Sequence, residues 1–124
     1  MAKLPEEVLK AWKDRNCPPT LTTVNAKGIP NSVYVANVTL LDDESIGIAD
    51  GAFSKTRENI LSQSAGTFLF LTEEAAYQIK GHFEYHKEGA VMEAAKDWAD
   101  FSFPVHAIAV LKVDAVYNGA EQLA

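Results

Sequence analysis

The segment Tyr77-Gln78-Ile79-Lys80-Gly81-His82-Phe83-Glu84-Tyr85-His86 alternates between apolar and polar side chains. In an extended chain, every second side chain points to the same side. The apolar residues therefore share one face, and the polar residues share the other. This pattern predicts a β-strand that covers a core with one face and meets water with the other.

Segments on both sides of this strand also predict β-structure. Residues 67–72 form a continuous apolar run between Gly66 and Glu73, which indicates a well-buried strand. Further strands are expected at 20–25, 31–41, 45–49 and 105–116. Several connections are too short for the crossover that parallel strands need. The sequence therefore predicts a mainly β fold with six antiparallel strands, closed into a barrel so that few edges stay exposed.

Three short helices are expected to flank the barrel. The first covers Pro5–Asn16, with Val8, Leu9 and Trp12 on one apolar stripe, and Pro18-Pro19 ends it. The second covers 54–62, with the Ser54 side chain as a plausible N-cap, and the third covers 88–99.

Composition limits the classes of function. The chain has 124 residues, 48% of them hydrophobic, which suits one domain over 1–124 with residues 1–17 as a helical extension. Its net charge of −6 argues against a nucleic-acid surface and against docking on anionic membranes. No apolar run approaches the roughly 20 residues of a membrane helix. One cysteine and no signal-like N-terminus make the cytoplasm the expected location.

The stretch 50–60 predicts an anion site. A strand runs through a glycine-containing loop into a helix start, where backbone N–H groups favour an anion. Ser54 and Thr56 add hydroxyl donors, and Lys55 and Arg57 add positive charge to an otherwise acidic chain. A phosphate group suits these donors, and Arg57 is expected to contact it bidentately. An ordinary capped helix is the alternative reading.

The histidines do not predict a metal site. The strand spacing separates His82 from His86 by about 13 Å, and His106 lies on another strand. No clustered ligand pattern is present, so no metal is expected. No side chain stands out as a catalytic acid or base, and no catalytic residue is predicted.

Four short segments carry a resemblance to a known family: 27–32 (Lys-Gly-Ile-Pro-Asn-Ser), 54–56 with 59–60 (Ser-Lys-Thr and Asn-Ile), 79–81 (Ile-Lys-Gly) and 120–123 (Ala-Glu-Gln-Leu). With these segments in this order and at this spacing, the chain resembles the FMN-binding split-barrel family related to pyridoxamine phosphate oxidase. It is most similar to the small bacterial FMN-binding proteins of that family. The resemblance implies a Greek-key split β-barrel, FMN as cofactor, and a homodimer with FMN at the subunit interface.

The resemblance also implies a set of binding residues. The family's phosphate-binding Lys-Thr pair falls on Lys55 and Thr56, and a polar pair near the phosphate and ribityl chain falls on Asn31 and Ser32. The loop Asp50, Gly51, Ala52 and Phe53 would run beside the isoalloxazine edge. From the partner subunit, Phe103 would approach the ring, with Phe101 and Trp98 as competitors, and Gln122 and Leu123 would reach the neighbour's flavin.

These implications favour an FMN-binding flavoprotein that transfers electrons or acts as an oxidoreductase on a small acceptor. The redox partner is not predicted. The chain is much shorter than true pyridoxamine phosphate oxidases, and their C-terminal substrate-binding segment has no match. Two alternatives stay open: a split barrel that binds haem, through His82, His86 or His106, or a deazaflavin; and a cofactor-free dimeric interaction module.

Overall fold

The computed structural model describes residues 2–124. Its strands are β1 (Thr20–Val24), β2 (Pro30–Tyr34), β3 (Val38–Asp42), β4 (Ser45–Asp50), β5 (Ala65–Leu71), β6 (Ala76–His86), β7 (Ala107–Asn118) and β8 (Glu121–Gln122). The α-helices are α1 (Glu6–Ala11), α2 (Lys55–Leu61) and α3 (Ala90–Ala94), and the 3₁₀ turns are η1 (Trp12–Asp14) and η2 (Ala95–Asp97).

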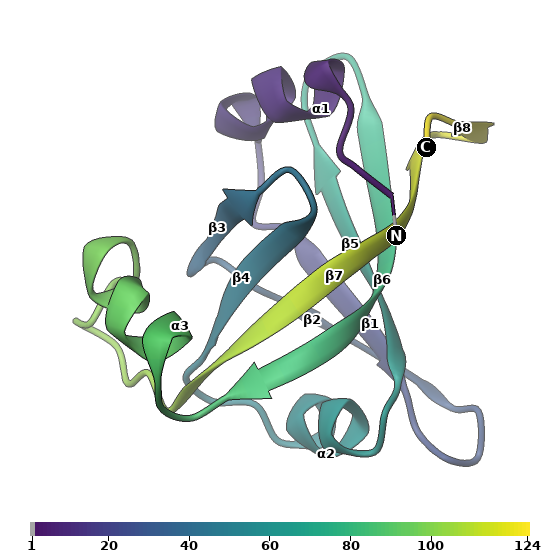
Figure 1. The fold of residues 1–124 in the computed structure, drawn as a ribbon. Coiled ribbons are helices and arrows are strands. Elements are labelled where there is room, and N and C mark those ends of the chain that lie inside the picture. The colour runs from purple at the N-terminus through teal and green to yellow at the C-terminus, as the bar shows by residue number, and fades with distance from the viewer. Residues whose placement is uncertain (1) are drawn as a thin grey trace.

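The strands form one antiparallel sheet that curls into a barrel (Figure 1). Their order is β2-β1-β5-β6-β7-β4-β3, and β8 pairs with β7. Within residues 2–124 the two end strands, β2 and β3, do not pair with each other. The predicted mainly β, antiparallel split barrel is therefore confirmed. Helix α2 crosses one end of the barrel, while α1 and β8 lie towards the other end (Figure 1).

The single strand predicted over 31–41 is wrong. The chain leaves β1 after Tyr34 and joins β4 at Val38, so two strands replace one. Between them, the Val35 N–H donates to the Pro19 carbonyl oxygen and Asn37 O accepts from Ala49 N–H, which fixes a corner. A run of β-branched residues hides such a corner. This corner and the short β8 raise the predicted six strands to eight.

The alternation that predicted β6 is confirmed, since Tyr77 and Ile79 are buried and Lys80 and His82 are exposed. A bulge interrupts the β6–β7 register at Gly81, where a Cβ would collide with the Lys112 carbonyl oxygen. Only glycine permits this approach of two backbones. The bulge lets the long strands bend around the barrel.

The N-terminal segment covers the barrel end opposite α2. The helix is shorter than predicted, since α1 ends at Ala11 and the chain continues through η1. Its apolar stripe packs as expected: Val8 is fully buried, and the Trp12 ring stacks on Phe68 at 5.6 Å between centroids. Trp12 also meets Phe70 edge-on at 5.4 Å. Among residues 2–124, no helix has the length and apolarity to cross a membrane.

Candidate functional site

A cleft of about 550 Å³ opens where β2, the corner 35–37, the end of β4 and the start of α2 meet. This volume lies within the usual range of small-molecule sites. Of the predicted site residues, the structure brings eight to this cleft: Asn31, Gly51, Ala52, Phe53, Ser54, Lys55, Thr56 and Phe103.

The polar end of the cleft lies between β2 and α2. The Asn31 amide donates to the Thr56 hydroxyl oxygen at 3.0 Å, and Thr56 is only 2% exposed. A hydroxyl that accepts this bond still has its own proton to donate. Lys55 is exposed, and among the described residues it forms no ion pair. One lysine and one hydroxyl group with a proton to donate thus line the cleft side by side, which suits an anion.

Two sequence expectations about α2 do not hold. Ser54 occupies the N-cap position, but its side chain makes no capping hydrogen bond. Arg57 does not face the cleft as a free cation, because its Nε donates to Asp50 Oδ2 at 2.7 Å and its Nη2 donates to Asp50 Oδ1 at 3.0 Å. Lys55 is therefore the one predicted cation left available for a ligand. With only seven residues in α2, these side chains rather than the helix carry the site.

A second Asn–Thr pair of the same kind anchors α2 from behind. The Asn59 amide donates to the Thr23 hydroxyl oxygen at 3.0 Å, and both residues are buried. Together with buried Ile60, Asn59 fixes the helix against β1. The Asn31–Thr56 and Asn59–Thr23 hydrogen bonds thus have the same length, but only the first pair borders the cleft.

The loop Gly51–Ser54 forms one wall of the cleft. At Gly51 a Cβ would lie 2.5 Å from the Pro104 carbonyl oxygen, so the loop and the 99–104 segment approach each other closely. Asn37 holds the same segment through two hydrogen bonds: its amide donates to Asp100 O at 3.1 Å, and the Asp100 N–H donates to Asn37 Oδ1 at 2.9 Å. The 99–104 segment is therefore held by hydrogen bonds to Asn37 and lies close against the loop at Gly51.

The rest of the cleft is mostly apolar. Val33 and Val35 line its floor, and Phe53, Phe103 and Pro104 stand around it. The exposed fraction is 66% for Phe103, at the cleft mouth. Flat apolar walls beside a polar end suit a ligand with an aromatic ring and a charged tail.

Four predicted site residues lie outside the cleft. Ser32 is on the other face of β2, where its hydroxyl contacts the Thr22 hydroxyl at 2.7 Å. The Asp50 carboxylate is buried beneath the loop. Gln122 and Leu123 lie at β8, towards the barrel end away from α2 (Figure 1). In this chain they do not border the site, so their predicted contact requires a second subunit.

None of the three histidines lines the cleft, although the backbone N–H of His106 donates to the Asp50 carbonyl oxygen beside it. His82 Nδ1 lies 2.9 Å from Asp114 Oδ2, and His86 Nε2 lies 3.2 Å from Glu84 Oε1, both at the surface. Residues 2–124 hold no group of three or more His, Cys, Asp or Glu side chains suited to a metal ion.

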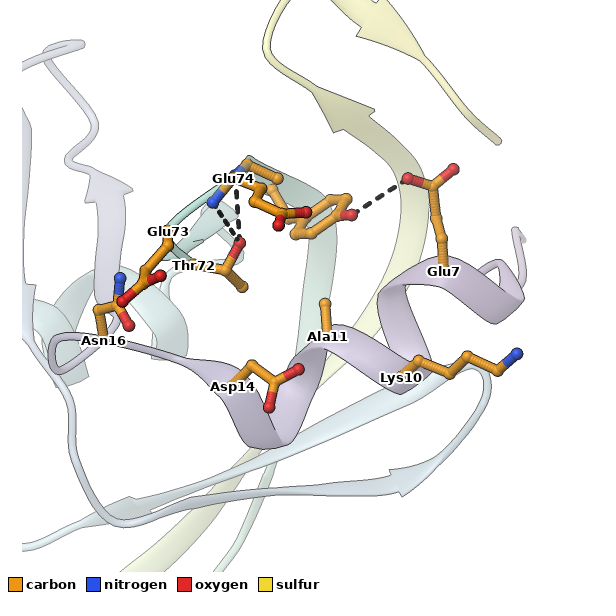
Figure 2. Close-up of a pocket in the computed structure, with 10 residues that line it drawn as sticks. Glu7, Lys10, Ala11, Asp14, Asn16, Thr72, Glu73 and Glu74 are labelled. Carbon is orange, nitrogen blue, oxygen red and sulfur yellow. Dashed lines mark hydrogen bonds between the residues drawn. The ribbon is translucent and has the colours of Figure 1, made fainter.

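A second hollow, of about 600 Å³, lies between the N-terminal helix and the β5–β6 turn (Figure 2). We call it the acidic groove, since Glu7, Asp14, Glu73 and Glu74 line it. Lys10 is the one lysine among its lining residues, and its ammonium group lies 3.8 Å from Glu6. The groove also contains the Tyr77 hydroxyl, which donates to Glu7 Oε2 at 3.1 Å. Sequence reasoning missed the groove, because it forms from segments far apart in the chain.

Comparison with known proteins agrees with the fold. The uncharacterized protein MJ0282 of Methanocaldococcus jannaschii is 28% identical over 124 residues, which cover 95% of this chain and 82% of that protein. The crystal structure of HupZ from Group A Streptococcus matches with a TM-score of 0.84 and 27% identity over 98% of both chains. An FMN-binding protein from Syntrophomonas wolfei matches with a TM-score of 0.70 and 19% identity, over 91% of this chain and 95% of that one.

The family profile described as Pyridoxamine 5'-phosphate oxidase matches residues 4–117. The match runs from just before the N-terminal helix to Tyr117 in β7 and includes every residue of the cleft. The chain therefore belongs to the pyridoxamine 5'-phosphate oxidase family.

Proposed function

We propose that the protein is an FMN-binding flavoprotein that holds its cofactor in the cleft between β2 and α2. The observation that carries this proposal is the polar end of the cleft, where Lys55 and the Thr56 hydroxyl stand together in a chain of net charge −6. FMN would supply the redox chemistry, and the protein would bind and orient it.

The donor set fits a phosphate monoester. Such a group carries close to two negative charges at neutral pH and accepts several hydrogen bonds. Lys55 would contribute charge, and Thr56 would donate its hydroxyl proton, because Asn31 already occupies an acceptor site of that oxygen. The absence of Lys55 from the ion pairs within residues 2–124 leaves its ammonium group free for this contact.

The opposite part of the cleft fits the isoalloxazine ring. Phe53, Phe103 and the valines of β2 offer apolar surface for its flat faces, and the loop at Gly51 and Ala52 offers backbone polar groups for its edge. The FMN-binding protein of Syntrophomonas wolfei has the same fold, which supports the choice of FMN among ring-bearing phosphates. We propose that the protein transfers electrons or reduces a small acceptor, and we assign no catalytic acid or base.

We further propose a homodimer with the flavin at the subunit interface. Tyr34 and Phe103 border the cleft and are 76% and 66% exposed, an unusual amount of aromatic surface to leave in water. A second subunit would cover this surface and would bring its Phe103, Gln122 and Leu123 towards the cofactor. Light scattering should then give a mass of twice 13.5 kDa.

The direct experiment is the visible spectrum of the purified protein, followed by chromatography of the ligand released on denaturation. We expect the two absorption bands of an oxidised flavin, release of FMN, and saturation of the cofactor-free protein by added FMN at one flavin per chain. A protein that stays colourless and does not bind added FMN would contradict the proposal. Release of a deazaflavin, or a Soret band on haem addition, would assign the cleft to another cofactor.

A further inference from the structure

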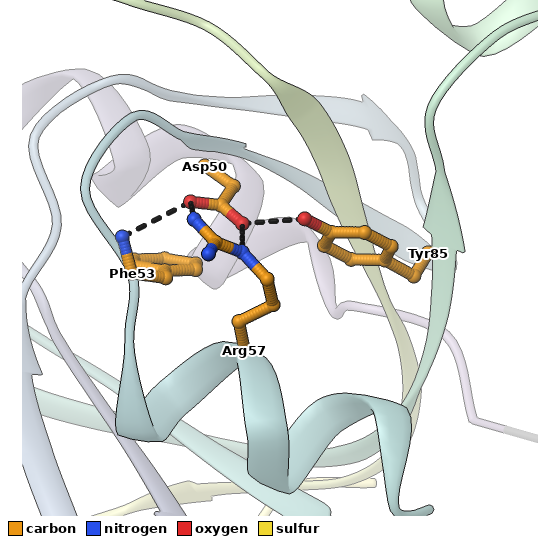
Figure 3. Close-up of polar contacts among 4 residues, drawn as sticks. All are labelled: Asp50, Phe53, Arg57 and Tyr85. Carbon is orange, nitrogen blue, oxygen red and sulfur yellow. Dashed lines mark hydrogen bonds and ion pairs between the residues drawn. The ribbon is translucent and has the colours of Figure 1, made fainter.

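The carboxylate of Asp50 lies directly beneath the cleft loop and accepts four hydrogen bonds (Figure 3). Asp50 is the last residue of β4 and is fully buried. Besides the two bonds from Arg57, it accepts the Tyr85 hydroxyl at 2.5 Å and the Phe53 backbone N–H at 3.0 Å. A buried carboxylate is tolerated only when it is paired and hydrogen-bonded in this way.

These donors come from three different parts of the fold. Phe53 belongs to the loop itself, Arg57 to α2 and Tyr85 to β6 (Figure 3). The Asp50 backbone is held as well, since its carbonyl oxygen accepts the His106 N–H at 2.8 Å. One side chain therefore fixes the loop 51–54 relative to the helix on one side and the barrel wall on the other.

The charge state of this network is stable near neutral pH. Burial by itself would raise the pKa of Asp50, but the hydrogen bonds from Arg57, Tyr85 and Phe53 outweigh it, and the pKa lies below its ordinary value. Burial and the bond to Asp50 raise the pKa of Tyr85, so its phenol remains a donor. The carboxylate thus stays ionised and its partners stay protonated across the neutral range.

We propose that Asp50 is a positioning residue for the ring end of the cofactor: its carboxylate sets the conformation of the loop 51–54 before the ligand binds. The family resemblance implied that the main chain of the loop 50–53 runs beside the flavin, and it assigned no role to the Asp50 side chain, which does not line the cleft. This inference rests on the proposed function. Holding a binding loop in its bound conformation improves affinity, because less freedom is lost on binding.

The test uses Asp50→Asn and compares two ligands, FMN and riboflavin, which share the ring but differ in the phosphate. If Asp50 positions the ring end, both dissociation constants should rise by a similar factor, about tenfold, and their ratio should stay constant. The absorption bands of the bound flavin should also shift, because the ring environment changes. Tyr85→Phe removes one of the four bonds and should give a smaller change of the same kind.

A matched control is Asp42→Asn. Asp42 accepts the Glu44 N–H and the Ser45 hydroxyl, both at 2.8 Å, at the opposite end of β4 and away from the cleft. The Asp42→Asn variant should leave the affinities for FMN and riboflavin and the flavin spectrum unchanged, even if it lowers the melting temperature as much as Asp50→Asn does. The comparison separates positioning from loss of stability. A variant that only loses stability melts at a lower temperature but binds both flavins with unchanged affinity.

Two results would overturn the inference. One is unchanged affinity for both flavins in folded Asp50→Asn and in Tyr85→Phe. The other is a change in the ratio of the two constants, which would mean that freed Arg57 acts on the phosphate. If Asp50→Asn does not fold, Tyr85→Phe decides by the same criteria. Failure of the wild-type protein to bind either flavin would instead overturn the proposed function.

Discussion

The cleft and the acidic groove are hollows of similar size with opposite chemistry. The cleft measures about 550 Å³ and the groove about 600 Å³. The cleft is largely apolar and contains Lys55, which forms no ion pair within residues 2–124. The groove gathers four carboxylates, and its one lining lysine already has Glu6 beside it. Volume alone therefore does not indicate which of the two hollows binds a ligand.

Charge distinguishes the two. An anionic ligand would lose solvation in the groove and meet like charges there, whereas the cleft provides an ammonium group and an oriented hydroxyl. The contrast also explains how a chain of net charge −6 can present an anion site: no carboxylate lines the cleft among the described residues, and the buried carboxylate of Asp50 is paired with Arg57. Local arrangement, not net charge, decides which ligand fits.

The largest effect is expected from reversing the charge in the cleft. Lys55→Glu makes the polar end resemble the acidic groove, and FMN affinity should fall by about a hundredfold or more, since a charge-assisted contact becomes a repulsion. Flavin fluorescence quenching measures this. Lys10→Glu changes the net charge of the protein equally but lies in the groove, and it should leave FMN affinity within twofold. Equal losses in both variants would mean that general charge, rather than the cleft, governs binding.

A smaller effect is expected from the two Asn–Thr pairs. Thr56→Val keeps the side-chain shape but removes the hydroxyl, so FMN affinity should fall by about tenfold while riboflavin affinity changes little. Thr23→Val removes the equivalent hydroxyl behind α2 and should cost about 1 kcal/mol of unfolding free energy without changing FMN affinity. Titration calorimetry and urea unfolding separate the two results. Loss of FMN affinity in Thr23→Val alone would contradict the assignment.

The sequence predicted the fold well where one face of a strand is buried. The alternation in β6 and the apolar run of β5 placed both strands correctly, because burial imposes a period of two on the side chains. It failed at the corner 35–37, where the chain changes neighbours without a glycine or proline to mark it. Corners of this kind are set by tertiary hydrogen bonds, which a local pattern does not contain.

The same limit applies to the site. Lys55 and Thr56 could be singled out from the sequence because they are adjacent and lie at the start of a predicted helix, and both line the cleft. The ion pair between Arg57 and Asp50 was not predicted, because it belongs to a network whose third partner, Tyr85, comes from a strand that is distant in sequence. The spacing of seven residues between Asp50 and Arg57 gave no signal, since a loop separates the strand from the helix.

The Asp50 network beneath the cleft is expected to make stability depend on pH. The pKa of Asp50 is lowered in the folded protein, so its contribution to stability is present above the unfolded value of about 4 and is lost as pH falls through the lower folded value. In urea unfolding at pH 7, 4 and 3, the deficit of Asp50→Asn relative to wild type should therefore be largest at pH 7 and shrink in acid. A deficit that stays constant over this range would show that the charge of Asp50 contributes nothing.

The smallest effect is expected in the acidic groove. Tyr77→Phe removes the hydrogen bond to Glu7 while keeping the buried ring, so the unfolding free energy should fall by about 1 kcal/mol or less. FMN affinity should not change. A tenfold change in FMN affinity would show that the groove, or the N-terminal helix that forms it, takes part in cofactor binding.

The most direct measurement is an NMR titration of the cofactor-free, ¹⁵N-labelled protein with FMN, because it reports on both hollows at once. We expect shift changes for the amides of Asn31 and residues 51–56, and none for the groove amides of Glu7, Asp14 and residues 72–75. Changes confined to the groove, or no change at saturating FMN, would contradict the central claim that the cleft between β2 and α2 is the FMN site.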